Sequence, residues 1–261
     1  MLSTVFRHRL PELSSDVFIK DLLRSFSIHR PFEANRFPGW DLDKVLSLLM
    51  KHPYEPVNSI PLRELTKKVM FLVALATIKR VGELQALSKT VATQQGDMIL
   101  TYVESFLAKT ESQANPLPRV IVLKSLREIL CPDDMERFLC PCRALKAYIK
   151  RTKKILNRPD NLFVSPAKND QAISKNAISF FLRELLKEAG AISPRAHSIR
   201  GVGATTALKL NVAVDKILTS ATWKSSNVFQ MHYLKEFKLE YPDFSTLGPF
   251  ISAGQVVQVS Q

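Results

Sequence analysis

The feature that most constrains this chain is the uninterrupted apolar run VMFLVALATI, residues 69–78. A membrane-spanning helix needs about 20 apolar residues, so this run is too short to cross a bilayer. It indicates instead a helix buried inside a folded protein. The rest of the chain must supply a core around it, and 261 residues of which 46% are hydrophobic are sufficient for that.

Helical patterns surround this run along the chain. Asp41 fits the N-cap position of a helix over 41–51, and Pro61 fits the first turn of a long helical stretch over 62–84. Further helices are predicted over four segments: 174–190, with Ser174 as its N-cap and Gly190 beyond its end, then 201–210, 214–221 and 226–237.

The pattern changes in the middle of the chain. Residues 98–107 and 119–123 are rich in β-branched and aromatic side chains, which favour strands. A loop with two prolines, residues 108–118, separates them. We therefore predict a β-hairpin, and a fold that is mainly α-helical with a small antiparallel sheet (α+β).

Positive charge is in large excess. The chain has 37 Lys and Arg against 24 Asp and Glu, a net charge of +13, which favours a polyanionic partner, nucleic acid ahead of membrane. No acid occurs between Cys140 and Pro159, where one helix face is basic and the other apolar. Such a face is often only solvated, but five cations without a carboxylate favour contacts with the DNA backbone. The predicted phosphate contacts are Arg143, Lys146, Lys150, Lys153 and Lys154, with Lys175 and Arg195 in addition.

The cysteines indicate neither a disulfide framework nor a zinc site. Cys131, Cys140 and Cys142 are too few for the first and lack the spacing and the nearby histidine for the second. The basic residues 7–9 are not followed by an apolar run, so no signal peptide is predicted. We expect reduced thiols in an intracellular protein, and no bound metal.

The chain offers the groups that metal-free phosphodiester cleavage requires. Two guanidinium groups suit the extra negative charge of the pentacoordinate transition state, a lysine or histidine protonates the leaving 5′ oxygen, and a tyrosine is able to form a reversible covalent ester. Each candidate alone has a common structural explanation, and Tyr241 is a rival nucleophile directly before Pro242. The candidates, in chain order, are Arg80, Lys109, His197, Arg200, Trp223 and Tyr233.

This ordered set resembles the catalytic set of the tyrosine recombinases, also called the phage integrase family. KRVGEL resembles the family's first arginine box, HSIR its His-x-x-Arg box, and LAKT its hairpin lysine. Tyr233 follows Trp223 by ten residues, whereas nine is the spacing in many members. That spacing, with GWDLDKVL, LCPCRALKAYI, NLFVS and ATWKSSNVFQMHYL, resembles the recombinases of DIRS-type and Ngaro-type eukaryotic retrotransposons.

The resemblance implies a site-specific recombinase or integrase with a tyrosine recombinase catalytic-domain fold over 36–261. Double-stranded DNA is the implied partner, with self-association into dimers or tetramers on DNA, no cofactor and no membrane. The implied location is the nucleus for a eukaryotic element, and otherwise inside the cell with DNA. The implied roles are Tyr233 as nucleophile, Arg80 and Arg200 on the phosphate oxygens, Lys109 as general acid, His197 assisting proton transfer, and Trp223 donating its indole N–H.

Other functions stay open at this point. Residues 1–35 are expected to be a linker and a remnant of an N-terminal helical core-binding domain, too short for the whole domain. This favours the alternative of a truncated or domesticated DNA-binding module of the same fold without turnover. An enzyme that relaxes DNA, like the type IB topoisomerases, and an RNA-binding helical protein are further alternatives.

Overall fold

The computed structural model describes residues 16–29, 39–108, 111, 119–126, 134–223 and 225–233. The chain divides into two units, Met1–Asn35 and Arg36–Gln261. The described part of the first unit is essentially one helix, α2 (Val17–His29). Among all the helices described, none is long and apolar enough to cross a membrane.

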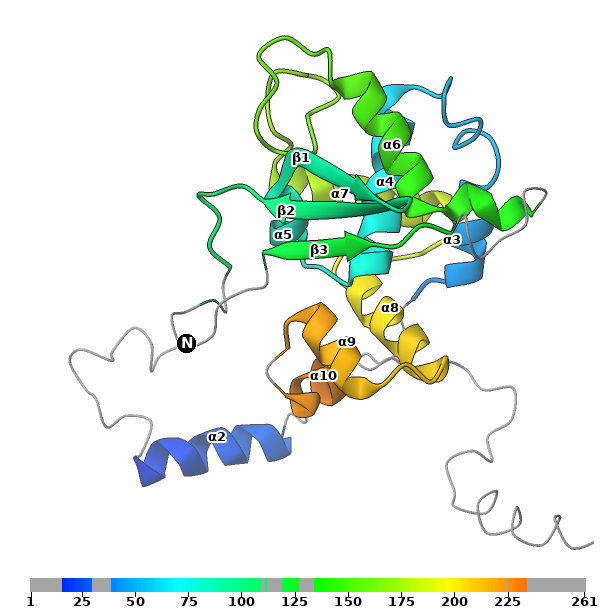
Figure 1. The fold of residues 1–261 in the computed structure, drawn as a ribbon. Helices are drawn as coiled ribbons and strands as arrows, with labels where there is room; N and C mark the ends of the chain where they lie inside the picture. The colour runs from blue at the N-terminus through cyan, green and yellow to red at the C-terminus, as the bar shows by residue number, and fades with distance from the viewer. Residues whose placement is uncertain are drawn as a thin grey trace, which may run out of the picture. The chain divides into compact units, whose positions relative to one another are not determined.

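The described part of the second unit is mainly α-helical with one small antiparallel sheet, as predicted (Figure 1). Its elements, in chain order, are α3 (Leu42–Leu49), α4 (Leu62–Thr77), α5 (Val81–Gln85), β1 (Leu87–Gln94), β2 (Asp97–Tyr102), β3 (Val120–Leu123), η1 (Met135–Leu139), α6 (Pro141–Thr152), α7 (Lys175–Glu188), α8 (Ser198–Lys209), α9 (Val214–Ala221) and α10 (Ser226–His232).

The sheet has the strand order β1-β2-β3. The predicted hairpin is confirmed as β2 and β3, which pair antiparallel, although β2 ends at Tyr102 rather than at residue 107. The strand β1 was not predicted, because LSKTVATQ is mostly polar and much of it is exposed at the edge of the sheet. It joins β2 through a tight turn in which Gln95 and Gly96 both have positive φ.

The helix α4 is the centre of this unit. The run 69–74 is fully buried, as its composition predicts, and α4 contacts α6, α7, α8 and β3. The predicted continuation of this helix to residue 84 is wrong. Ile78 adopts the left-handed conformation (φ 55°) and ends α4, and Arg80 becomes the N-cap of α5. The chain therefore turns immediately before Arg80.

The predicted capping residues are confirmed. The Asp41 carboxylate accepts hydrogen bonds from the backbone N–H groups at the start of α3, and Ser174 Oγ accepts one from Ala177 N at 3.1 Å. Gly190 closes α7 with a φ of +91°. These local signals place the helix starts correctly because capping depends on neighbouring residues alone.

A glycine allows α8 to approach α4 closely. A Cβ atom on Gly203 would lie 3.2 Å from the backbone oxygen of Leu75 and 3.3 Å from the Leu75 Cδ1 atom. A larger residue would push the two helices apart. Gly203 therefore keeps the start of α8 close to the chain that follows α4.

Two hydrophobic clusters build the second unit. The larger one surrounds α4, and the smaller one unites α8, α9 and α10 around buried Ile78, Trp223 and Phe229. Tyr233 packs against the smaller cluster. In Figure 1 the helices α8, α9 and α10 lie at one end of the unit and α6 at the other.

Candidate active site

A buried carboxylate organises one side of the candidate site. Glu83 Oε2 accepts a hydrogen bond from the Arg80 backbone N–H at 2.7 Å and lies 3.4 Å from Arg200 Nη1. The Thr222 hydroxyl donates to Glu83 Oε1 at 3.4 Å. Three segments that are distant in sequence therefore meet at Glu83: the start of α5, the first turns of α8 and the end of α9.

Arg200 lies between this carboxylate and two aromatic rings. Its side chain is 2% exposed, and its second terminal nitrogen donates to the Ala221 carbonyl. Its Cζ atom lies 4.7 Å from the ring centre of Trp223 and 5.3 Å from that of Tyr233. These contacts fix the guanidinium group in one orientation.

Positive charge exceeds negative charge here. Burial and the positive charge of Arg80 together lower the pKa of Arg200 to about 10, with Glu83 opposing them. Burial likewise lowers the pKa of Lys79, with Glu83 opposing and with Arg200 and Arg80 adding to the effect. At pH 7 Arg200 keeps its charge. Arg80 and Arg200 therefore repel each other beside one carboxylate, and an anion such as a phosphate would reduce that repulsion.

The structure brings Tyr233 to this cluster. Its hydroxyl and His197 Nε2 are hydrogen-bonded at 3.1 Å, and its ring centre lies 4.5 Å from that of Trp223. The Tyr233 backbone holds this position, because its N–H donates to Phe229 O at 2.9 Å and its carbonyl accepts from Thr205 Oγ1 at 3.4 Å. The hydroxyl of Tyr233 therefore faces a histidine that is able to exchange a proton with it.

Two buried donors beside Tyr233 lack a hydrogen-bond partner in the described part of the chain. They are Arg200 Nε and the indole Nε1 of Trp223. Leaving such a donor unsatisfied costs about 1–3 kcal/mol, so their presence indicates an absent acceptor. Tyr102 Oη is also buried without a hydrogen-bond partner among the described residues. Burial raises the pKa of Tyr102, the charge of Glu83 adds to this effect, and the charge of Arg200 opposes it.

Lys109 lies outside the described residues. The residues that flank it are linked to each other: Ala108 N donates to Glu111 Oε2 at 3.0 Å, and Glu111 N donates to Ala108 O at 2.9 Å. Arg119 donates to the Glu111 carboxylate at 2.6 Å from the start of the returning strand. The base of the predicted lysine loop is therefore defined, whereas its proposed role stays a prediction.

The predicted basic face of α6 is separate from this cluster. Arg143 bonds the carboxylate of Glu55 through both terminal nitrogens, at 2.7 and 2.9 Å, so the expectation that no carboxylate offsets these cations is wrong for Arg143. Glu55 also binds Lys68, near the start of α4. Arg80 follows the C-terminal end of α4, and Thr77, the last residue of that helix, lies about 14 Å along the axis from Lys68 at 1.5 Å per residue.

The other predicted phosphate contacts divide between these two places. Lys146, Lys150 and Lys153 line a cavity along α6, and Lys154 is exposed just after that helix. Lys175 lies close to the start of α5, which Arg80 caps. Its Cε atom is 3.6 Å from the position that a Cβ atom on Gly82 would occupy. Arg195 is exposed two residues before His197.

Sequence reasoning did not assign roles to several residues of this site. Glu83 stands three residues after an N-cap, a spacing typical of a capping glutamate, so a signal for it existed. Lys79, Tyr102 and Thr222 carry no local signal, because their importance arises from packing between distant segments. Among the described residues no group of three or more His, Cys, Asp or Glu is arranged to hold a metal ion.

Comparisons with known proteins identify the family and the fold of the chain. A model of the Phage integrase family matches residues 43–240. The structure resembles XerA recombinase, with a TM-score of 0.54, 19% identity, and coverage of 80% of this chain and 62% of XerA. It also aligns with a lambda integrase tetramer bound to a Holliday junction (TM-score 0.47, 15% identity, 80% of this chain, 52% of that chain). A lambda integrase(75-356) dimer bound to a COC' core site aligns too (TM-score 0.45, 14% identity, 85% and 74%).

A comparison with curated protein sequences gives no significant match. The chain spans less than two thirds of the length of XerA recombinase and of the lambda integrase in the tetramer. The family model nevertheless covers most of the chain, and the XerA comparison supports the same fold. On this evidence the chain belongs to the phage integrase family.

Proposed function

We propose that this chain is a site-specific DNA recombinase that cleaves and rejoins DNA through a 3′-phosphotyrosine on Tyr233. The observation that carries the proposal is the position of the Tyr233 hydroxyl, 3.1 Å from His197 Nε2 and beside the unpartnered donors of Arg200 and Trp223. A nucleophile, a proton acceptor and anion-binding donors thus occupy one place. This is the set of groups that phosphoryl transfer without a metal requires.

In this proposal the Tyr233 oxygen attacks the scissile phosphorus and the bond to the 5′ oxygen breaks. His197 accepts the phenol proton or hydrogen-bonds the phosphate, and Lys109 donates a proton to the departing 5′ oxygen. Arg80, Arg200 and the Trp223 indole N–H bind the non-bridging oxygens, which carry more negative charge in the transition state. A 5′ hydroxyl of another strand then attacks the ester and releases Tyr233.

Double-stranded DNA is the proposed substrate, and two or four copies of the chain are proposed to assemble on it. Lys175 and Arg195 are proposed phosphate contacts near the cleavage site, and the α6 cations are proposed contacts farther away. We further propose that the chain derives from a DIRS-type or Ngaro-type retrotransposon and works in the nucleus. That origin is supported by the sequence stretches quoted above, and by the ten-residue spacing from Trp223 to Tyr233.

The second candidate is a DNA-binding module of the same fold that does not turn over. It is supported by the net charge of +13, which favours DNA binding with or without cleavage. Such a module would bind duplex DNA in a salt-dependent way and form no covalent adduct. A type IB topoisomerase-like activity would instead relax supercoiled plasmid without sequence preference.

A trapping experiment separates these functions. The chain is incubated with a pool of random-sequence duplexes that carry single nicks, and protein–DNA adducts are detected on denaturing gels. We expect an adduct from the unaltered chain and from Tyr241→Phe, and none from Tyr233→Phe. An adduct that persists in Tyr233→Phe would refute the assignment of the nucleophile, and DNA binding without any adduct would favour the inactive module.

A further inference from the structure

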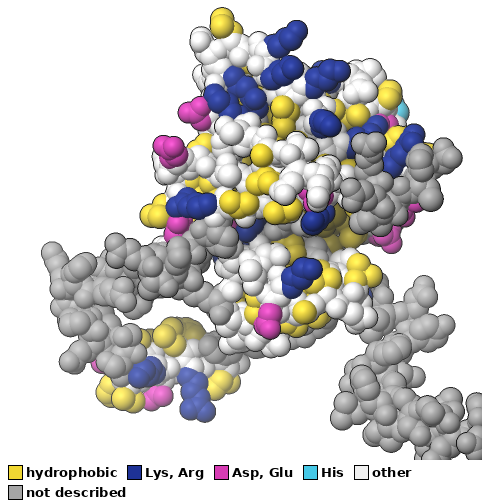
Figure 2. Space-filling view, viewed as in Figure 1, with side chains coloured by type: hydrophobic (Ala, Val, Ile, Leu, Met, Phe, Trp, Pro, Cys, Tyr) yellow, Lys and Arg dark blue, Asp and Glu magenta, His cyan; other side chains and the backbone are white. Residues whose placement is uncertain are grey.

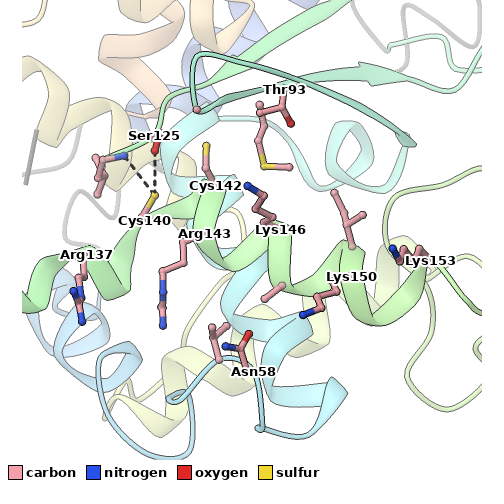
Figure 3. Close-up of a pocket in the computed structure, with 16 residues that line it drawn as sticks. Asn58, Thr93, Ser125, Arg137, Cys140, Cys142, Arg143, Lys146, Lys150 and Lys153 are labelled. Carbon is pink, nitrogen blue, oxygen red and sulfur yellow. Dashed lines mark hydrogen bonds between the residues drawn. The ribbon is translucent and has the colours of Figure 1, made fainter. Parts of the chain in front are cut away.

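A cavity lies along α6, at the opposite end of the sheet from Ala108 and Arg119. This cavity of about 960 Å³ is bounded by α6, by the β1–β2 turn at Gly96 and by the chain before α4 at Val57 and Asn58 (Figure 3). This volume is within the range of small-molecule sites. The cavity therefore has room for a ligand of several hundred daltons.

The lining of this cavity combines apolar and cationic side chains. Val57, Met98 and Leu126 contribute apolar surface, and no carboxylate occurs among the described residues that line it. Figure 2 shows Lys and Arg side chains gathered over the same end of the unit. The cationic lining residues are Arg137, Arg143, Lys146, Lys150 and Lys153. This composition suits a small ligand that is both anionic and partly apolar.

Two thiols open onto the same cavity. Cys140 and Cys142 line it, both are free, and each is 5% exposed. Cys140 precedes the first turn of α6, and its sulfur accepts a hydrogen bond from Leu126 N at 3.4 Å, with Ser125 Oγ at 3.9 Å (Figure 3). Donors of this kind and a helix N-terminus both stabilise a thiolate.

The two thiols differ in what they contact. The Cys142 thiol donates to Leu123 O at 3.1 Å, which favours its protonated form. The neighbouring Cys142 thiol and the Leu126 N–H donor lower the pKa of Cys140 to about 5, against the opposing effect of burial. Cys142 shows the reverse, with its pKa raised by Cys140 and by burial. Cys140 is therefore the nucleophile of the pair.

We propose that this cavity binds a small anionic disulfide and that Cys140 forms a mixed disulfide with it. The Cys140 thiolate attacks one sulfur of the disulfide, a new S–S bond forms, and the original S–S bond breaks with departure of a thiolate that takes a proton from water. Cys140 is oxidised, half of the disulfide is reduced, and no further reactant is needed. Lys146 and Lys150 bind the carboxylates of the incoming molecule. This inference does not depend on recombinase activity.

The probe is oxidised glutathione, an anionic disulfide, compared with the cationic disulfide cystamine. The full chain is treated with each, and the modified cysteine is identified by peptide mass mapping over time. We expect Cys140 to be modified first, and at least about tenfold faster by oxidised glutathione than by cystamine, because the cationic lining attracts the anion. The variant Cys140→Ser is expected to lose this reaction, whereas Cys142→Ser and Cys131→Ser keep it.

A variant without two of the lysines tests how the cavity recognises an anionic disulfide, separately from the reactivity of Cys140. Lys146→Ala combined with Lys150→Ala is expected to slow the reaction with oxidised glutathione at least fivefold and to leave the reaction with cystamine unchanged or faster. Thermal unfolding of each variant shows whether its fold is intact. Faster modification of Cys131 or Cys142, equal rates for the two disulfides, or an unreactive Cys140 in the folded chain would each overturn the proposal.

Discussion

Arg200 and Glu83 face each other across the interior of the candidate site, with Nη1 and Oε2 3.4 Å apart and neither side chain more than 3% exposed. The pair joins α8 to α5, which are far apart in sequence. Buried ion pairs of this kind contribute more to orientation than to net stability, but removing one partner leaves the other uncompensated. Glu83 is therefore expected to matter for both folding and cleavage.

Glu83→Gln is expected to lower the free energy of unfolding by about 3 kcal/mol, because Arg200 would keep its charge without a buried counterion. Chemical denaturation measures this loss. Glu104→Gln, on an exposed position after β2, is the control and is expected to change stability little. A Glu83→Gln variant as stable as the control would show that the carboxylate charge does not hold Arg200.

Trp223→Phe removes the unpartnered indole N–H while keeping an aromatic ring against Phe229 and Tyr233. Trp223 is buried in the smaller cluster, so the smaller ring is expected to lower the free energy of unfolding by about 1–2 kcal/mol, less than truncation to alanine would. Cleavage is expected to fall about 10²-fold, because a donor to the transition-state oxygens is also lost. Thermal unfolding and single-turnover adduct formation measure the two effects. An unchanged rate of adduct formation in the folded variant would show that the indole N–H does not act in cleavage.

Acid is expected to destabilise the chain through Glu55. Burial alone would raise the pKa of this carboxyl, but its bonds with Arg143 and Lys68 outweigh burial and hold the pKa below its ordinary value. A carboxyl with a lowered folded-state pKa stabilises the fold above its unfolded pKa, and this contribution disappears as pH falls through the folded-state value. Glu55→Gln should cost about 3 kcal/mol at neutral pH, since Lys68 is fully buried.

Denaturation at neutral and at acid pH tests this assignment. The difference in stability between the unaltered chain and Glu55→Gln is expected to shrink as the pH falls. Asp160→Asn, which breaks an exposed pair with Lys89, is the matched control and is expected to have little effect at either pH. A constant difference between the two curves would contradict the role given to Glu55.

Salt dependence distinguishes the two proposed groups of phosphate contacts. The logarithm of the DNA affinity is expected to fall linearly with the logarithm of salt concentration, by about 0.9 per phosphate neutralised. Replacing Lys146, Lys150 and Lys153 by alanine should reduce this slope, and so should Lys175→Ala with Arg195→Ala. If only the second variant reduces it, the DNA contacts lie beside the catalytic residues and α6 does not contribute.

The sequence was most informative where a signal is local. Asp41 and Ser174 mark helix starts, and the apolar run from Val69 marks the central helix, because capping and burial patterns depend on nearby residues. The end of that helix could not be predicted, since nothing in TIKRVGEL requires Ile78 to adopt a left-handed conformation. The packing of Gly203 against Leu75 and the pairing of Arg143 with Glu55 were equally inaccessible, because each joins segments far apart along the chain.

The attachment of Tyr233 to α10 has a consequence for any assembly of this chain. The Tyr233 hydroxyl contacts His197, and the Tyr233 ring lies against Arg200, in its own polypeptide. Under the proposed function each subunit would therefore carry both the nucleophile and the groups proposed to activate it. In an assembly of mixed copies, a subunit with Tyr233→Phe would fail to cleave only the DNA strand that it binds. A subunit that lacks Arg200 would also fail to cleave its strand, because a neighbouring subunit would not supply the missing arginine. Strand choice would then follow the position of each intact copy on the duplex.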